Sequence, residues 1–266
     1  GLNSPLSPFP VKNRHIKCHR IEKLNAQTIK NAIIGINDTI KTIIEEKKGM
    51  NGIVIPSSHI LRDQIYQAQL LNFKPPLTDG ILGEDYVECP ICKAHLWQLF
   101  PHVEKNHNIN VYKFTRLHPH IPIFAGKAQI ITNGSQSVER KQAMEMFSSN
   151  TQPRVWISTY PREGFDGIDD LLRFIVIPKV FYPYLGDPLV RKRKELQPSS
   201  YPIEALRTLI QASGRGVRHK DDWCEIHILD SNIDSLIRQC RGISRGLQDE
   251  LRGISIVPLW WLKAID

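Results

Sequence analysis

The sequence predicts an α/β fold with a central parallel sheet, because short apolar strands alternate with amphipathic helices along most of the chain. Residues 52–71 read as a strand, a turn and a helix in succession, and residues 128–147 repeat that order. The alternation stops at Pro75 and returns near residue 123. We therefore expect one α/β domain that is interrupted by an insertion.

The elements of this domain follow in chain order from the apolar patterns. After an opening segment rich in Pro and Ser, residues 15–21 predict a strand and residues 25–48 predict a helix that ends in charges before Gly49. The other expected strands are 52–58, which ends in a polar turn, 128–132, 154–158, 174–177 and 224–229, and the other expected helices are 60–71, 137–147 and 203–213. The boundaries that follow are 1–78 and 123–266 for the two parts of the domain and 79–122 for the insertion.

Composition and charge narrow the class of protein. The chain has 266 residues, 41% hydrophobic and 23% charged, which excludes collagen-like, mucin-like and wholly disordered proteins. Its 35 Lys and Arg against 27 Asp and Glu give a net charge of +8, which favours an anionic partner such as nucleic acid or nucleotide. Five cysteines, an odd number, argue against a disulfide framework.

The start of the chain carries no targeting signal. Residues 1–10 have neither a basic region nor an apolar region of the kind found in signal peptides, and no apolar run in the sequence reaches the ~18 residues of a membrane span. We expect a cytoplasmic protein without a membrane partner. Because Gly1 has no Met before it, we also expect a fragment of a longer polypeptide.

The insertion carries a candidate metal site. Cys89 and Cys92 stand two residues apart, His102 follows after nine more, and His107 after four more. Two thiolates on a tight turn and two imidazoles one helical turn apart can offer four ligands to a tetrahedral Zn²⁺, and a site with four protein ligands is structural. Two alternatives stay open: the cysteines can be a reduced pair beside unrelated histidines, and His95 can replace one of the four ligands.

The same stretch resembles the prokaryotic Ros/MucR-type zinc finger in its ligand spacing, its helix and the tail from His107 to Tyr112. The resemblance implies structural zinc and hints at a prokaryotic, plasmid or viral source. Whether the finger binds DNA or protein stays open. Candidate phosphate contacts are Lys93, Lys105, Lys113 and Arg116, whereas Trp97, Leu99 and Phe100 can form its small core or dock it on the domain.

A short run that contains two arginines lies near the end of the α/β domain. Gln211 falls on the helix predicted at 203–213, Gly214 and Arg215 form a turn, and Arg218 follows before a strand. Hydrolysis of a polyphosphate develops charge on the γ-phosphoryl oxygens, and two guanidinium groups at this spacing can point at one such group. We expect Gly214 to be a turn glycine that lets the arginines emerge.

This Q-x-x-G-R-x-x-R run resembles motif VI of superfamily 2 helicases, and its surroundings resemble the XPD/DinG branch of that superfamily. The matching segments are Ser7–Pro10 for the entry to the second motor domain, Ile53–Ser57 for motif IV, Asn133–Phe147 for the next helix, Arg162–Asp166 for motif V and Pro183–Arg191 for the proline-rich signature after it. The resemblance implies a RecA-like motor domain of an ATP-dependent DNA helicase that moves 5′ to 3′ on single-stranded or forked DNA.

The resemblance also assigns roles to individual residues. It places Arg215, Arg218 and Gln211 in catalysis, and Gly214, Glu163, Gly164 and Asp166 at the nucleotide. It places Ser57 and Ser58 against the nucleic-acid backbone. Because the insertion falls between motifs IV and V, we expect it to lie away from the arginine turn.

Several family motifs are missing from the sequence. It contains no GxxxxGK[ST] phosphate loop, no DEAH-like acidic motif and no iron-sulfur cysteines. We therefore expect the chain to be the second motor domain alone, inactive by itself, with ATP and Mg²⁺ held mainly by an N-terminal motor domain of the same polypeptide.

Two other classes of function compete with this one. The chain can be a nucleic-acid-binding module or regulator on a degenerate motor scaffold, although the intact Q-x-x-G-R-x-x-R run argues against degeneracy. A metal-dependent nuclease lacks a suitable carboxylate cluster in the sequence. The basic run from Arg191 to Lys194 is interpreted as a solvated helix face.

Overall fold

The six strands of the central sheet are all parallel and lie in the order β1-β8-β7-β2-β6-β5, which confirms the predicted α/β class. The computed structural model describes residues 10–25, 27–73, 80–123, 125, 129–134, 136–148, 153–159, 167–251 and 258–265. The strands are β1 (Arg14–Glu22), β2 (Gly52–Val54), β5 (Gln129–Thr132), β6 (Arg154–Ile157), β7 (Phe174–Ile177) and β8 (Cys224–Asp230).

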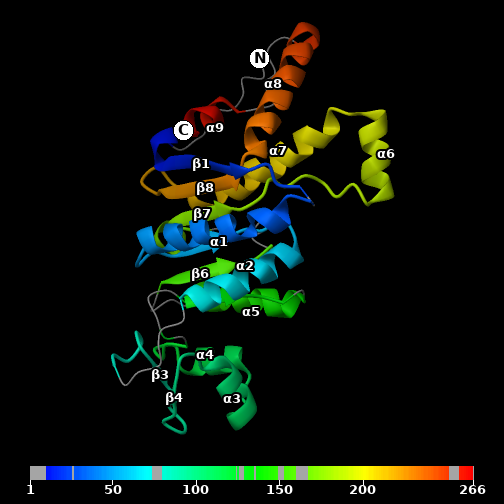
Figure 1. Cartoon of the computed structure of the whole chain (residues 1–266). Coiled ribbons are helices and arrows are strands. Elements are labelled where there is room, and N and C mark those ends of the chain that lie inside the picture. The colour runs from blue at the N-terminus through cyan, green and yellow to red at the C-terminus, as the bar shows by residue number, and fades with distance from the viewer. Residues whose placement is uncertain are drawn as a thin grey trace.

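Helices cover both faces of this sheet (Figure 1). They are α1 (Ile29–Glu46), α2 (His59–Asn72), α5 (Ser137–Ser148), α6 (Pro188–Leu196), α7 (Ser200–Ser213), α8 (Asn232–Leu251) and α9 (Leu259–Ala264), with short 3-10 turns η1 (Val11–Asn13), η3 (Asp169–Leu171) and η4 (Gly214–Gly216). Among the described helices, none is long and apolar enough to cross a membrane.

Alternation along the strands divides the core into two layers. Val54 packs with α1 and α2 on one face, whereas its neighbours Ile53 and Ile55 pack with α5, α7 and α9 on the other. The inward positions of α1 recur at helical spacing, at Ile36, Ile40, Ile43 and Ile44. Both faces of every central strand are therefore apolar, as expected of a parallel sheet covered on two sides.

Because the strands are parallel, all their carboxyl ends lie on one side of the sheet and all their amino ends on the other. We call these two sides the carboxyl edge and the amino edge. Ser57 and Ser58 follow β2, so they lie at the edge formed by the carboxyl ends of the strands. The arginine turn η4 precedes β8 and the turn η3 precedes β7, so both lie at the amino edge. The motif VI residues and the motif IV serines are thus on opposite edges.

The insertion folds as a small hairpin and two helices below β5 and β6 in Figure 1. These elements are β3 (Val87–Glu88), β4 (His95–Leu96), α3 (Phe100–His107) and α4 (Val111–Leu117). The insertion leaves the body after α2 and returns at the start of β5, so both connections are at the amino edge. The insertion shares this edge with the arginine turn, but β5 is four places from β8 in the sheet, about 20 Å, so the insertion lies away from that turn as expected.

The insertion shares a hydrophobic core with the body. Val103 and Phe114 are fully buried in the same cluster as Ala143 and Phe147 of α5. Two backbone hydrogen bonds join the segment between β4 and α3 to the chain that leaves the insertion: Leu99 N–H donates to the Ile123 carbonyl (2.9 Å) and Ala125 N–H donates to the Trp97 carbonyl (2.8 Å). The insertion is therefore packed as part of the domain.

Candidate functional site

The predicted motif VI residues line one open pocket at the amino edge. Gln211 is exposed on the last turn of α7, and Arg215 and Arg218 are half-buried on the turn and loop that follow. Together with Gly214 they line a pocket of about 380 Å³. The structure therefore brings together the four residues that the sequence grouped.

The structure requires glycine at a different position of this turn from the one expected. Gly214 has a φ of −80°, which any residue adopts, and a Cβ there would meet nothing within 4 Å. The turn thus does not require glycine at this position, and a side chain would instead enter the pocket. Gly216 is the sterically required one, because a Cβ there would lie 2.2 Å from the Cys224 Sγ. Sequence reasoning missed Gly216.

A buried carboxylate, Asp222, fixes the loop that carries Arg218. Its Oδ2 accepts a hydrogen bond from the Arg218 N–H (3.0 Å), and its Oδ1 accepts from Arg173 Nη1 (2.9 Å) and from the Trp223 N–H (2.9 Å). The Arg173 guanidinium also lies over the Trp223 ring, 4.8 Å from its centroid. Because both oxygens of the buried carboxylate are hydrogen-bonded, the loop is held in one conformation.

Positive charge gathers around this turn. Arg14, at the start of β1, is almost fully buried, and its pKa is lowered by that burial and by the charge of Arg218. Two guanidinium groups that repel one another raise the local positive potential. Such a site attracts a polyanion.

The crossover between β6 and β7 links the two edges of the sheet. The predicted motif V residues Glu163, Gly164 and Asp166 lie outside the described residues. Further along the crossover, Asp169 has a φ of +51°, and its Oδ1 lies 2.8 Å from His219 Nε2 in the arginine loop.

Asp169, His219 and Asp222 offer three possible ligand atoms within 4.8 Å of one another. Both Asp222 oxygens are already occupied by protein donors, which favours a structural cluster over a cation site.

The four predicted zinc ligands converge in the insertion. Their donor atoms all lie within 4.8 Å of one another. Cys92 Sγ is 3.0 Å from His102 Nε2, Cys89 Sγ is 3.4 Å from His107 Nε2, and the two Nε2 atoms are 3.2 Å apart. Ligands of a tetrahedral Zn²⁺ stand about 3.5 Å apart, given bond lengths of about 2.0 to 2.3 Å. The donor set and its spacing therefore fit zinc.

The surroundings of these ligands also suit a metal. Lys93 adopts a φ of +62° and its N–H donates to the Cys89 carbonyl (2.8 Å), which closes the turn between the cysteines. The Asn106 side-chain amide packs against the other ring nitrogen of His102, with Asn106 Nδ2 2.8 Å from His102 Nδ1. His95, the rival ligand, stacks on Tyr86 with centroids 4.1 Å apart and is outside the four-atom cluster.

The candidate DNA contacts do not form one surface. Ser57 is half-buried, and Ser58 caps α2, since its Oγ accepts from the Leu61 N–H (3.3 Å). On the insertion, Lys93 pairs with Glu88 (3.0 Å). The other basic candidates, Lys105, Lys113 and Arg116, are exposed. The serines and the basic residues thus belong to different parts of the molecule.

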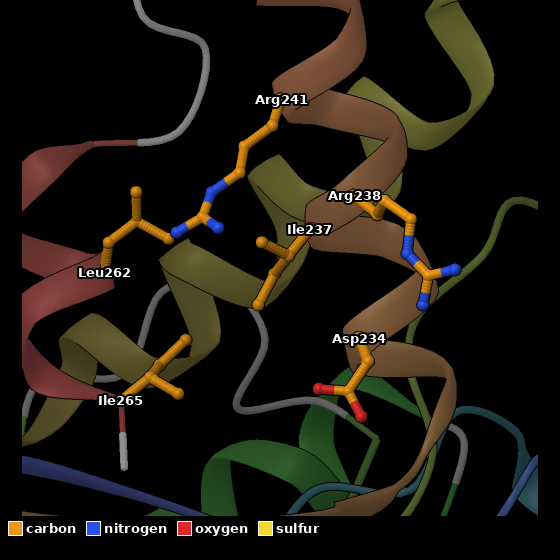
Figure 2. Close-up of a pocket in the computed structure, with 6 residues that line it drawn as sticks. All are labelled: Asp234, Ile237, Arg238, Arg241, Leu262 and Ile265. Atoms are coloured by element: carbon orange, nitrogen blue, oxygen red, sulfur yellow. The ribbon is translucent and has the colours of Figure 1, made fainter.

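A separate hollow of about 380 Å³ lies between α8 and α9 (Figure 2). Its lining residues are Asp234, Ile237, Arg238, Arg241, Leu262 and Ile265. In Figure 2 Arg241 extends towards α9, whereas Arg238 points to the other side of α8 near Asp234. Asp234 pairs with Arg20 of β1 (2.9 Å). The hollow contains no residue of the predicted sites, and sequence reasoning identified neither α8 nor this hollow.

Comparison with known proteins identifies related chains. Residues 99–241 match the family described as "Helicase C-terminal domain". A protein described as "Regulator of telomere elongation helicase 1 homolog", from Anopheles gambiae, is 30% identical over 109 residues, covering 36% of this chain and 11% of that protein.

Solved structures give a weaker likeness. "Structure of S. tokodaii Xpd4" matches with a TM-score of 0.46 and 13% identity, covering 95% of this chain and 37% of that one. A structure described as "XPD Helicase" matches with a TM-score of 0.46 and 14% identity, covering 86% and 34%. The chain spans about a tenth of the curated relative and about a third of these structures.

Proposed function

The chain belongs to the helicase C-terminal domain family, and from this we propose that it is the second motor domain of an ATP-dependent DNA helicase of the XPD/DinG branch. In this proposal it supplies Arg215 and Arg218 to an ATP site that it shares with an N-terminal motor domain of the same polypeptide. The observation that carries the proposal is the pocket in which Gln211, Arg215 and Arg218 converge.

The arrangement of the pocket suits phosphoryl transfer. Half-buried guanidinium groups stabilise developing negative charge more strongly than exposed ones, because less water screens them. Asp222 holds the backbone at Arg218, so this side chain starts from a fixed position. Gln211 is placed to orient the attacking water or the γ-phosphate. Mg²⁺ would neutralise phosphate charge, and we expect its ligands on the N-terminal motor domain.

DNA is proposed to cross the opposite edge. There the serine turn after β2 and the crossover after β6 meet single-stranded or forked DNA, with the 5′ to 3′ direction inferred from the family resemblance. The turn at Asp169 reaches the arginine loop through His219 (2.8 Å). Both residues lie at the amino edge, so this contact ties the last part of the β6–β7 crossover to the arginine loop.

The insertion is proposed to be a structural zinc finger, with Cys89, Cys92, His102 and His107 as ligands. The support is the convergence of four suitable donor atoms within 4.8 Å of one another. Such a site leaves no open coordination position for a catalytic water.

The full-length protein provides the test of the motor assignment. We expect Arg218→Ala to lower DNA-stimulated ATP turnover by a factor of roughly 10³, the range for an arginine finger, while single-stranded DNA binding stays close to normal. Arg207→Ala, an exposed arginine on α7, is the control and should leave both unchanged. Loss of DNA binding with normal ATP turnover in Arg218→Ala would contradict the assignment.

A further inference from the structure

A groove of about 640 Å³ lies where the helix pair α6 and α7 meets α8. Tyr182, Lys194 and Tyr201 line one side, and Gln239 and Gly242 of α8 line the other. We call it the tyrosine groove. Its residues belong neither to the arginine turn nor to the zinc cluster.

The groove has an aromatic wall next to a cation. The rings of Tyr182 and Tyr201 stack with centroids 5.4 Å apart and an angle of 22° between them. Lys194 Nζ lies 4.7 Å from the Tyr201 centroid. Burial raises the pKa of Tyr182 to about 12 and also raises that of Tyr201, so both phenols stay neutral and do not repel phosphate. Unpaired bases stack on aromatic rings such as those of tyrosine, and a lysine beside them can contact the phosphate backbone.

The wall is continuous with a basic helix that the proposed motor function does not use. Helix α6 has the sequence PLVRKRKEL, with four basic residues and one acidic residue, and none of its residues is buried. Asp187 caps it by accepting from the Leu189 N–H (2.8 Å), and Pro188 occupies its first turn. In Figure 1 it stands apart from the sheet, beyond α7. Its charge matches the phosphates of a strand lying beside the groove.

The groove lies at the edge where the proposed DNA path runs. Tyr182 follows β7 at the carboxyl edge, and α8 begins at this edge after β8 before it reaches Gln239 and Gly242. β7 is the direct neighbour of β2 in the sheet, and Ser57 and Ser58 follow β2. A strand that passes the serine turn and continues across the end of β7 therefore reaches the tyrosine groove.

We propose that the tyrosine groove receives an unpaired base of single-stranded nucleic acid, while α6 contacts the flanking phosphates. This inference rests on the proposed function, because it extends the nucleic-acid path of that motor. A duplex does not suit the groove, since its bases are already stacked and paired.

Gly242 allows the groove to be closed without removing any contact. A Cβ at Gly242 would meet nothing within 4 Å, so a side chain there projects into open space. We expect Gly242→Trp to fill the groove and Gly242→Ala to leave it open. Tyr201→Leu removes one of the two rings of the aromatic wall. Tyr201→Phe keeps the ring and removes only the hydrogen bond from its hydroxyl to the Pro183 carbonyl (3.1 Å).

The experiment measures binding of the 266-residue chain to two fluorescent oligonucleotides of equal length, an oligo-dT and an abasic strand with the same number of phosphates. We expect the unaltered chain to prefer oligo-dT. Gly242→Trp and Tyr201→Leu should weaken oligo-dT binding about tenfold, the range for one stacked base, and leave abasic binding unchanged. The controls Gly242→Ala and Tyr201→Phe should bind like the unaltered chain, and circular dichroism checks that each variant is folded.

Two other results would overturn the proposal in different ways. If the unaltered chain binds oligo-dT and both groove variants bind it equally well, the groove is not a base site, although the DNA-binding part of the proposed function stands. If the unaltered chain binds neither oligonucleotide, both the groove and that part of the proposed function fail. If the larger substitutions unfold the chain, Lys194→Ala replaces them, because Lys194 is exposed. Unchanged oligo-dT binding by Lys194→Ala would count against the proposal.

Discussion

At the residue scale, Asp222 holds the loop that carries Arg218 although it carries no catalytic chemistry. It is fully buried and pairs with Arg173 at 2.9 Å while it holds the Arg218 N–H at 3.0 Å. A buried ion pair contributes little net stability, but loss of one partner leaves the other charge buried and unpaired. The Asp222 carboxylate is thus needed to compensate the largely buried charge of Arg173.

We expect Asp222→Asn to lower the free energy of unfolding by about 3 kcal/mol, because Arg173 then loses its buried counter-ion and keeps only the exposed Asp170, at 2.9 Å. Urea denaturation of the chain measures the effect. Asp221→Asn, at the exposed neighbouring position, is the matched control and should change stability by less than about 0.5 kcal/mol. Equal stability of the two variants would contradict this account.

At the element scale, sequence periodicity was enough for most of the sheet and its first helices. The strand expected at 174–177 and the helix expected at 137–147 correspond to β7 (Phe174–Ile177) and α5 (Ser137–Ser148). The run from Arg191 to Lys194 was interpreted as a solvated helix face and lies in α6, which buries no residue, but without an apolar stripe the bounds of α6 could not be predicted. Strand order was also out of reach, since it depends on pairing between distant segments such as β1 and β8.

The residues of the candidate site also differ in how well the sequence alone could identify them. Gln211, Gly214, Arg215 and Arg218 lie within one short run, so local spacing was enough to group them. The pair of Arg173 and Asp222 is 49 residues apart, and its importance comes from burial, which a single sequence does not reveal.

The pairing of β1 with β8 creates a pH-sensitive element. His227 is buried and 2.9 Å from His19, and its pKa is lowered to about 4, mainly by burial. Glu225 accepts from Lys17 and Lys47, both at 2.7 Å, and these bonds lower its pKa to about 2 although burial opposes them. The folded state thus binds fewer protons than the unfolded state at both groups.

Stability should therefore fall as the solution is acidified. His227 contributes to the loss between about pH 6.5 and 4, because only the unfolded state gains its proton there. Glu225 contributes below about pH 4.5. Thermal unfolding from pH 7.5 to 5 measures the first window, and His227→Phe should flatten the slope there. The exposed His15→Gln is the control and should keep it; an unchanged slope in His227→Phe would assign the loss elsewhere.

At the scale of the whole molecule, the shared core couples the insertion to the motor domain. Val103 and Phe114 are fully buried with Ala143 and Phe147 of α5, so loosening the insertion exposes apolar surface of the body as well.

We expect zinc in about one-to-one ratio in the purified chain, and we expect its removal by a chelator to lower the melting temperature of the whole chain, because metal binding stabilises the folded state. Elemental analysis and calorimetry measure the two. The Cys89→Ser and His102→Ala double variant should lose the metal, whereas His95→Ala should keep it. Stoichiometric zinc in the double variant would overturn the ligand assignment.

The position of the insertion decides how its function is tested. It joins the body at the same edge as the arginine turn but four strands away, and its proposed zinc has no open coordination position. We therefore expect it to take no part in hydrolysis, and any DNA that its basic residues contact must extend beyond the path proposed at the carboxyl edge. Replacing Lys93, Lys105, Lys113 and Arg116 with Ala should weaken DNA binding of the full-length enzyme at low salt, while the maximal ATPase rate stays close to normal.

The salt dependence separates a DNA contact from a protein contact. Each lysine or arginine that neutralises a phosphate adds about one to the magnitude of the slope of log affinity against log salt concentration. The variant with all four substitutions should therefore flatten this slope by up to about four. Lys93 should contribute least, because it is already paired with Glu88 at 3.0 Å. An unchanged affinity and slope would instead mean that the insertion docks protein, and the edge it shares with the arginine turn makes the N-terminal motor domain the first partner to test.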